Sequence, residues 1–319
     1  MGFGLASLAV MGNDALQTLG PFLAGQRGRA SRWWQGLFLA ALLCAVLALS
    51  WAAGEGDPAW GRLDRFALPQ PLGWIDLVPL LALLALTRLG LPVSTSFLVL
   101  TAVAPAQLGA MLRKSAAGYG AAFVVALLAY GLAAPWLEGA AAAEGEREGE
   151  GGLGLALPHQ AQRWLALPWL ATALLWCQWL VQDLANIYVF LPRRLNGAEL
   201  VVTLLVLCGA VALVVSLGGG PIQGRLRGKC RASDPRSTTV ISLLFGLVLL
   251  AFLGGDRLPM STSWLFLGLL GGREVGLGAR GLGQPAPRVA RELSLDLLAA
   301  GAALATSLAV ALLVAADRA

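Results

Sequence analysis

The chain has 319 residues, of which 57% are hydrophobic and only 13% are charged, and its formal net charge is +5. Because a soluble domain carries roughly 25% charged residues, this composition excludes a soluble globular protein and predicts a polytopic membrane protein. Backbone polar groups cannot bond to water inside a bilayer, so we expect the apolar runs to be helices. The arginines cluster beside apolar runs, a pattern that sets membrane orientation and argues against nucleic-acid binding.

The first half of the chain begins with an apolar run, 2–24, that is long enough to cross a core of about 30 Å. It is interrupted by polar and helix-breaking residues, so we expect it to be locally unwound: Gly12, Asn13, Asp14, Gln17, Gly20 and Pro21. No basic segment precedes this run, so we expect a mature helix and no cleaved signal peptide. Further apolar segments are expected at 33–53, 72–89, 97–111 and 119–136, with a polar loop at 54–71 and a basic break at Arg113 and Lys114.

Residues 139–159 are rich in Gly, Ala and Glu, and we predict a flexible acidic linker there. It separates a first transmembrane repeat, 1–138, from a second repeat, 160–319. The second half has apolar segments at 164–191, 198–217, 238–253, 264–270 and 295–315, with polar, Arg-rich loops at 218–237 and 271–292. The chain is therefore expected to contain about ten hydrophobic segments.

Two polar motifs each occur twice. Leu-Pro-Val-Ser-Thr-Ser at 91–96 returns as Leu-Pro-Met-Ser-Thr-Ser at 258–263, and Gly-Asn-Asp-Ala-Leu-Gln at 12–17 is matched by Val-Gln-Asp-Leu-Ala-Asn at 181–186. Asp14 precedes Ser94 by 80 residues, and Asp183 precedes Ser261 by 78. Recurrence in the same order at nearly the same spacing indicates an internal duplication, which is typical of secondary transporters.

The expected fold is an all-α polytopic membrane protein with two inverted-topology repeats and broken helices or re-entrant hairpins. An odd number of crossings in each half would invert the repeats. With the N-terminus outside, most Lys and Arg residues, including those from Arg225 to Arg236, lie in the cytoplasm and both termini are external. A parallel-repeat arrangement is the alternative, but it would place one Arg-rich loop outside. We expect the protein in the plasma (inner) membrane.

Carboxylates within membrane spans are costly, which makes Asp14 and Asp183 candidates for a functional site. Asn13, Gln17, Gln182 and Asn186 add the hard oxygen ligands that a small desolvated cation prefers. We therefore predict a sodium or proton coupling site at Asn13, Asp14, Gln182 and Asp183. The alternative is that each aspartate only satisfies backbone amides at a helix kink.

The two Ser-Thr-Ser turns offer hydroxyls and free backbone amides at the start of half-helices, where an anion is stabilised. We predict that Ser94, Thr95, Ser96, Ser261, Thr262 and Ser263 line one shared oxyanion pocket. A single copy would instead be a plain helix cap. Arg88 and Arg257 lie near the turns and could attract an anion, although an arginine near a helix end usually extends to the membrane interface.

These motifs resemble the inorganic phosphate transporter family, whose two inverted repeats each hold a Gly-Ala-Asn-Asp-Val-Ala-Asn-Ala segment followed by a Gly-Leu-Pro-Val-Ser-Thr-Thr-His segment. Residues 90–96 and 12–14 match closely, and Asp183 and Asn186 keep the family's Asp and Asn. The resemblance implies that the Asp and amide positions, with Gln17 and Asn186, serve the cation and phosphate, and that the turns bind phosphate. Phe97 and Trp264 replace the family's His, and Ser96 and Ser263 its Thr.

The expected function is secondary active transport of an inorganic oxyanion, phosphate or its rival sulfate, coupled to sodium or a proton. The expected partners are these ions and the lipid bilayer, with possible homo-oligomerisation. The other hypotheses are a sensor or assembly protein that does not transport, and a membrane enzyme acting on lipid. An enzyme would need a metal or histidine centre, and His159 is the chain's one histidine. The four scattered cysteines have no metal spacing, so we expect no cofactor and no enzyme.

Overall fold

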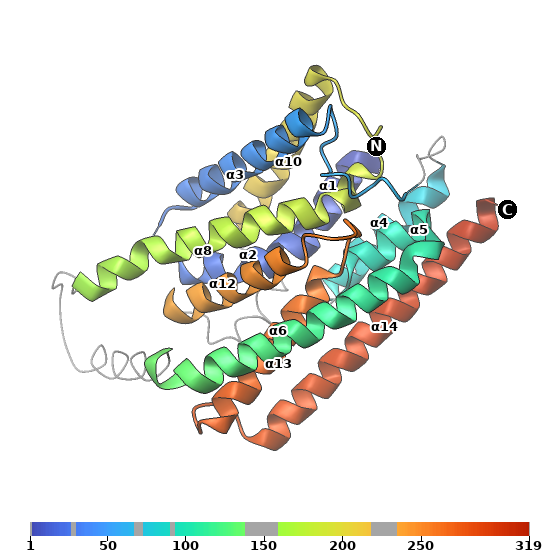
Figure 1. Cartoon of the computed structure of the whole chain (residues 1–319). Coiled ribbons are helices and arrows are strands. Elements are labelled where there is room, and N and C mark those ends of the chain that lie inside the picture. The colour runs from blue at the N-terminus through green and yellow to red at the C-terminus, as the bar shows by residue number, and fades with distance from the viewer. Residues whose placement is uncertain are drawn as a thin grey trace.

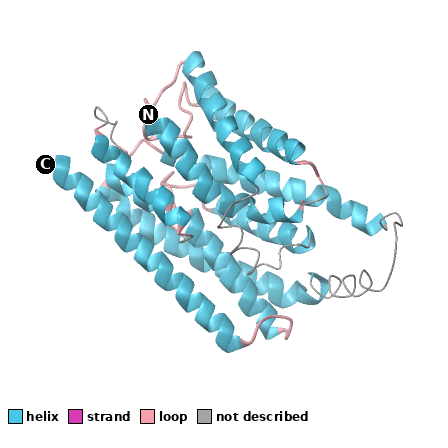
Figure 2. Cartoon of the chain, turned by 180° about the vertical axis from the view of Figure 1, so that it is seen from behind, coloured by secondary structure: helices cyan, strands magenta, loops and turns pink. Residues whose placement is uncertain are grey.

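The computed structural model describes residues 2–26, 30–66, 73–89, 93–137, 159–217 and 235–318. All regular secondary structure within these ranges is helical (Figures 1 and 2). The predicted acidic linker, apart from His159, and most of the Arg-rich loop at 218–237 fall outside the described residues, so the predictions for them stay untested.

The first apolar run is helical throughout. It consists of α1 (Gly2–Val10), a π-helical turn η1 (Met11–Ala15) and α2 (Leu16–Gly25). The expected unwinding is therefore wrong. The polar motif lies instead in a widened turn, and π-turns of this kind occur frequently at functional sites because they reorient the side chains that they carry.

The next helix, α3 (Arg32–Ala53), begins after Ser31, whose side chain caps it by accepting a hydrogen bond from the Trp34 amide. The next described helices are η2 (Trp74–Leu77) and α4 (Val78–Arg88). The first Ser-Thr-Ser turn follows, and then η3 (Ser96–Leu100) and α5 (Thr101–Val103) form a short broken helix.

The predicted break at Arg113 and Lys114 is wrong. The chain breaks earlier, at Ala104 and the short helix η4 (Pro105–Gln107), and α6 (Leu108–Leu137) then runs without interruption through both basic residues. Lys114 is tolerated inside the helix because its ammonium group is paired: Nζ lies 2.7 Å from Asp256 Oδ1 and donates to the carbonyl of Leu258 at 2.8 Å.

The second half contains long helices and one short one. They are α8 (His159–Asp183), α9 (Ala185–Tyr188), α10 (Gly197–Leu217), α12 (Pro235–Ala251), α13 (Thr262–Ala279) and α14 (Ala286–Arg318). The helix α8 ends at Asp183, so the second polar motif lies at a break between α8 and α9.

The predicted loop at 271–292 is also wrong over most of its length, because α13 extends to Ala279 and α14 begins at Ala286. The glycines that suggested a loop form a helix-packing surface. A Cβ added at Gly268 or Gly272 would lie 2.3 Å from the Tyr119 carbonyl oxygen or 2.0 Å from that of Phe123. Small residues at this four-residue spacing let two membrane helices approach closely, here α13 against α6.

Four of the described helices are long and apolar enough to cross a membrane. These are Arg32–Ala53, Pro105–Ala133, Gly197–Leu217 and Ala286–Asp317. They carry large apolar side chains on the outer surface, such as Leu132, Leu205 and Leu298, each at least 68% exposed. A water-facing surface would not carry such side chains in this density, so the protein is an integral membrane protein with an all-helical fold.

The helices form an elongated bundle (Figure 1). α3 pairs with α10 on one side and α14 packs against α5, η3 and α13 on the other, with α2, α8 and α12 between them. Both views place the start of α1 and the end of α14 at the same end of the bundle, opposite the end of α6 and the start of α8. The polar motifs lie within the core that these helices enclose.

Candidate functional site

The structure brings together side chains from both copies of both motifs. All eleven of the predicted site residues whose side chains are described are at most 4% exposed: Asn13, Asp14, Ser94, Thr95, Ser96, Gln182, Asp183, Asn186, Ser261, Thr262 and Ser263. Hydrogen bonds join the two halves of the chain at this point. The side chain of the twelfth residue, Gln17, lies outside the description.

The two Ser-Thr-Ser turns bind each other reciprocally. Ser96 Oγ donates a hydrogen bond to the carbonyl of Met260 at 3.3 Å, and Ser263 Oγ donates to the carbonyl of Val93 at 3.0 Å. Ser96 and Ser263 occupy the same position in the two motif copies, as do Val93 and Met260. The last serine of each turn therefore contacts the third residue of the other six-residue motif copy.

The first serine of each turn is a helix cap. Ser94 Oγ accepts a hydrogen bond from the amide of Phe97 at 3.3 Å, and Ser261 Oγ accepts one from the amide of Trp264 at 3.2 Å. The capping alternative thus describes these two residues well. It does not account for Thr95, Ser96, Thr262 or Ser263, whose hydroxyls take part in contacts between motifs.

Asn13 holds the first carboxylate against the first turn. Its Nδ2 donates to Asp14 Oδ1 at 2.7 Å, to the carbonyl of Val93 at 3.0 Å and to Thr95 Oγ1 at 3.2 Å. Thr95 and Ser263 also hydrogen-bond to the Asp14 carboxylate. Asp14 is therefore in contact with a turn from each half of the protein.

Asn186 has the corresponding role at the second carboxylate. Its Nδ2 donates to Asp183 Oδ1 at 3.0 Å and to Ser96 Oγ at 3.2 Å, and Thr262 hydrogen-bonds to Asp183. Each carboxylate thus binds the threonine of its own half's turn. The two aspartates lie close enough for the charge of Asp14 to act on Asp183.

Several buried polar atoms beside Asp183 have no hydrogen-bond partner among the described residues. They are Gln182 Oε1 and Nε2, Asp183 Oδ2 and Asn186 Oδ1. A buried polar group without a partner is costly, and native proteins seldom keep several together. Three of these atoms are oxygens of the kind that bind a small hard cation, so their chemistry fits a sodium site.

Arg62 is a functional candidate that the sequence did not single out. It comes from the loop after α3, yet it is only 3% exposed. Its guanidinium donates to the carbonyls of Leu253, Arg257 and Leu258 at 3.3 to 3.5 Å, and its charge acts on Asp183. Burial lowers the pKa of Arg62 to about 10, partly offset by Asp183, so it remains a cation at neutral pH.

The aromatic residues that follow the two turns contact each other. The rings of Phe97 and Trp264 meet edge to face, with centroids 5.4 Å apart and planes at 87°. They lie one residue beyond each turn, so they join the two turns by an apolar contact. Both arginines weighed from sequence are exposed: Arg88 lies at the end of α4, and Arg257 lines a cavity beside Arg62.

No protein-family model, curated protein or solved structure matches this chain.

Proposed function

We propose that this protein is a secondary active transporter of an inorganic oxyanion, with phosphate as the substrate and sodium or a proton as the coupling ion. The observation that carries the proposal is the reciprocal pair of bonds from Ser96 to Met260 and from Ser263 to Val93. A duplicated motif that folded only to cap two helices would have no need to meet its own copy. The meeting of the two copies at one buried point is what a central transport site requires.

The hydroxyl groups of the two turns suit an oxyanion that has lost its hydration shell. Thr95, Ser96, Thr262 and Ser263 contribute four buried hydroxyls from both halves, and α13 begins at Thr262, inside the second turn. A helix start stabilises negative charge through its backbone amides and the helix dipole. Arg62 adds a buried cation on the side of Asp183.

The carboxylates provide the coupling. Asp14 and Asp183 would repel an incoming anion unless a cation first balanced their charge. The unpartnered oxygens of Gln182, Asp183 and Asn186 are suited to bind that cation. Anion affinity then depends on cation concentration, and linkage requires the reverse dependence to be equally strong.

The inverted-repeat topology belongs to this proposal. The first half starts and ends at opposite ends of the bundle, and so does the second half (Figure 1). Each half therefore crosses the bundle in net terms, as inverted repeats with an odd number of crossings do. Rocking of one half against the other would expose the shared site alternately at the two faces.

Two further hypotheses are separated by one experiment. The first is transport of sulfate, which has the same tetrahedral shape as phosphate. The second is a sensor or assembly protein that does not transport, and the contact between Phe97 and Trp264 favours it because this contact holds the two turns together. Purified protein in proteoliposomes is given labelled phosphate, sulfate or arsenate with and without sodium and proton gradients. Gradient-driven phosphate uptake supports the proposal, sulfate uptake alone changes the substrate, and no uptake of any anion contradicts transport.

A further inference from the structure

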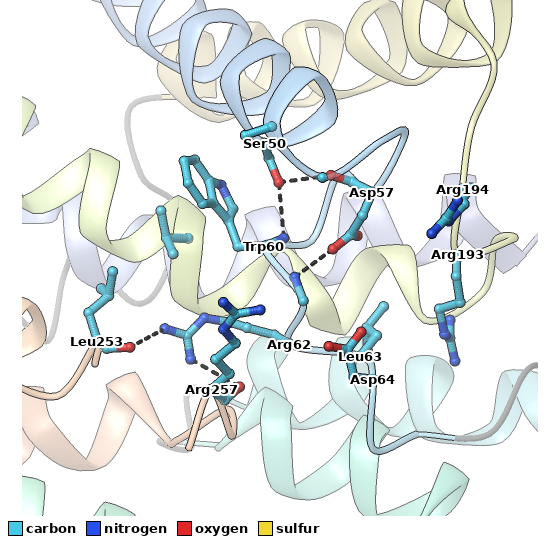
Figure 3. A pocket seen from close by; sticks show the side chains of 14 residues that line it. Ser50, Asp57, Trp60, Arg62, Leu63, Asp64, Arg193, Arg194, Leu253 and Arg257 are labelled. Atoms are coloured by element: carbon cyan, nitrogen blue, oxygen red, sulfur yellow. Dashed lines mark hydrogen bonds between the residues drawn. The ribbon is translucent and has the colours of Figure 1, made fainter. Parts of the chain in front are cut away.

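A second cationic site lies outside the motifs. It is a cavity of about 520 Å³ bounded by the loop after α3, the loop after α9 and the segment before the second turn (Figure 3). Four arginines line it, Arg62, Arg193, Arg194 and Arg257, against two acidic residues, Asp57 and Asp64. We call this cavity the arginine vestibule. Its lining has a positive net charge.

The acidic residues do not neutralise the arginines fully. Asp57 binds the backbone of its own loop, because Oδ1 accepts from the Ala59 amide at 2.7 Å and Oδ2 from the Gly61 amide at 2.5 Å. Arg194 pairs with Glu55 at 3.2 Å, but both side chains are more than 70% exposed, so this pair is weak. The vestibule therefore keeps donors for an external anion.

Two buried donors in the vestibule have no acceptor within the described part of the chain. These are Arg62 Nε and Trp60 Nε1, and Arg62 is more than nine-tenths buried. The guanidinium of Arg257 has no hydrogen bond or ion pair to any described residue. Unused donors on the buried Arg62 cation and on the Trp60 indole, beside the exposed cation of Arg257, fit an anion as the missing partner.

The backbone around the vestibule is strained. Trp60 and Arg257 both have positive φ angles, 57° and 52°, which side chains other than glycine rarely adopt. Gly61, at φ 68°, makes room for Arg257, since a Cβ there would lie 2.7 Å from Arg257 Nη1. Strain of this kind persists where the surrounding structure needs the side chains in a particular position.

We propose that the arginine vestibule binds a tetrahedral oxyanion, phosphate or sulfate, at the entrance to the buried site. Planar guanidinium groups bind such oxyanions through paired charge-assisted hydrogen bonds, and a positively charged cleft raises the local anion concentration. Oxyanion binding here does not depend on the function proposed above; only the role as an entrance rests on it.

The vestibule is connected to the buried site by sequence and by charge. Val181 lines the vestibule and Gln182, the next residue, belongs to the second polar motif. Arg62 lines the vestibule, donates to the carbonyl of Leu258 at the start of the second turn motif, and acts on Asp183. Arg62 therefore connects the lining of the vestibule with the second turn and the second polar motif.

Fluorine NMR of the full-length protein labelled with fluorotryptophan tests this proposal, with the Trp60 signal assigned by Trp60→Phe. Potassium phosphate is titrated in sodium-free buffer, with potassium chloride at equal ionic strength as the reference. We expect the Trp60 signal to shift saturably with phosphate and not with chloride. Arg257→Gln should weaken this binding roughly tenfold, the loss expected for one charge-assisted contact.

Two variants make the test specific. Arg194→Gln is a second vestibule variant that should also weaken binding, while Arg288→Gln removes an exposed arginine outside the vestibule and should leave the titration unchanged. Titrations of Arg257→Gln and Arg194→Gln that both match the wild-type titration, or a chloride shift equal to the phosphate shift, would overturn the proposal. If phosphate shifts the Trp60 signal and Arg257→Gln weakens this effect, but proteoliposomes show no uptake, oxyanion binding in the vestibule is supported and the transport function is contradicted. If proteoliposomes take up phosphate but the Trp60 signal does not shift, transport is supported and binding in the vestibule is contradicted.

Discussion

Ser263 Oγ lies 3.4 Å from Asp14 Oδ1 and 3.0 Å from the carbonyl oxygen of Val93, although Ser263 and Asp14 are 249 positions apart in sequence. A hydroxyl has one hydrogen to donate, so at any moment Ser263 serves mainly one of these acceptors. A cation or proton on Asp14 would make the carboxylate a poorer acceptor and release Ser263 to Val93. The charge state of the first half's carboxylate is thereby linked to the position of the second half's turn.

Ser263→Ala should raise the phosphate concentration for half-maximal uptake roughly tenfold, because it removes a hydroxyl from the proposed anion site and the hydrogen bond to Asp14. Uptake into proteoliposomes at fixed sodium measures this. Ser294→Ala is the control, since Ser294 is exposed and donates only to the carbonyl of Ala290 in its own helix. An unchanged half-maximal concentration in Ser263→Ala would remove this residue from the site.

Gly272→Ala should destabilise the protein by at least about 2 kcal/mol, because the added Cβ would lie 2.0 Å from the carbonyl oxygen of Phe123 and force α13 away from α6. Thermal unfolding in detergent measures the effect. Gly120→Ala on α6 is the matched control: nothing lies within 4 Å of a Cβ there, and alanine favours a helix. Equal midpoints for the two variants would mean that the two helices pack differently.

Asp256→Asn should lower the thermal midpoint by about 2 °C at neutral pH, since it breaks the partly exposed ion pair with Lys114. Burial would raise the pKa of Asp256, but hydrogen bonds from Lys114 and the Leu258 amide outweigh it, so the pKa lies below the ordinary 3.8. The charged form thus stabilises the fold above the ordinary pKa, and this stability is lost as pH falls through the lower value.

The difference in midpoint between wild type and Asp256→Asn should therefore be constant near neutral pH and shrink only below the ordinary aspartate pKa of 3.8. Glu55→Gln serves as the comparison, because its ion pair with Arg194 is almost fully exposed and should contribute nothing measurable. A difference that grows as the pH falls would show that the ion pair does not stabilise the fold.

The sequence predicted that the fold is all-helical and that the polar motifs lie close together. The second prediction was possible because Asp14, Asp183 and the Ser-Thr-Ser turns are too costly in apolar surroundings to be there without polar partners. The sequence-based predictions failed where the same residue type occurs in two structural environments. The glycines around Gly272 suggested a loop by composition, but their spacing suits close helix packing. Arg62 was missed because a buried arginine in a loop with mixed charge looks the same in sequence as a solvated one. The one available signal was the density of Asp and Arg residues at 57–65.

The proposed coupling of anion uptake to a cation depends on the carboxylates of Asp14 and Asp183. Asp14 hydrogen-bonds to Asn13, Thr95 and Ser263, and Asp183 to Thr262 and Asn186. Asparagine keeps the shape of aspartate and can keep part of these bonds, but it cannot carry the negative charge that attracts a cation. A coupling role and a structural role therefore lead to different results for the same substitution.

The most direct measurement is phosphate uptake into proteoliposomes by wild type, Asp14→Asn and Asp183→Asn, with sodium and pH gradients imposed separately. We predict that both variants fold and insert, and that their uptake no longer responds to the gradient that drives the wild type. Wild-type sodium and pH dependence in both variants would contradict this prediction, because the aspartates would then only satisfy polar groups at the π-helical turn that holds Asp14 and at the helix break that follows Asp183.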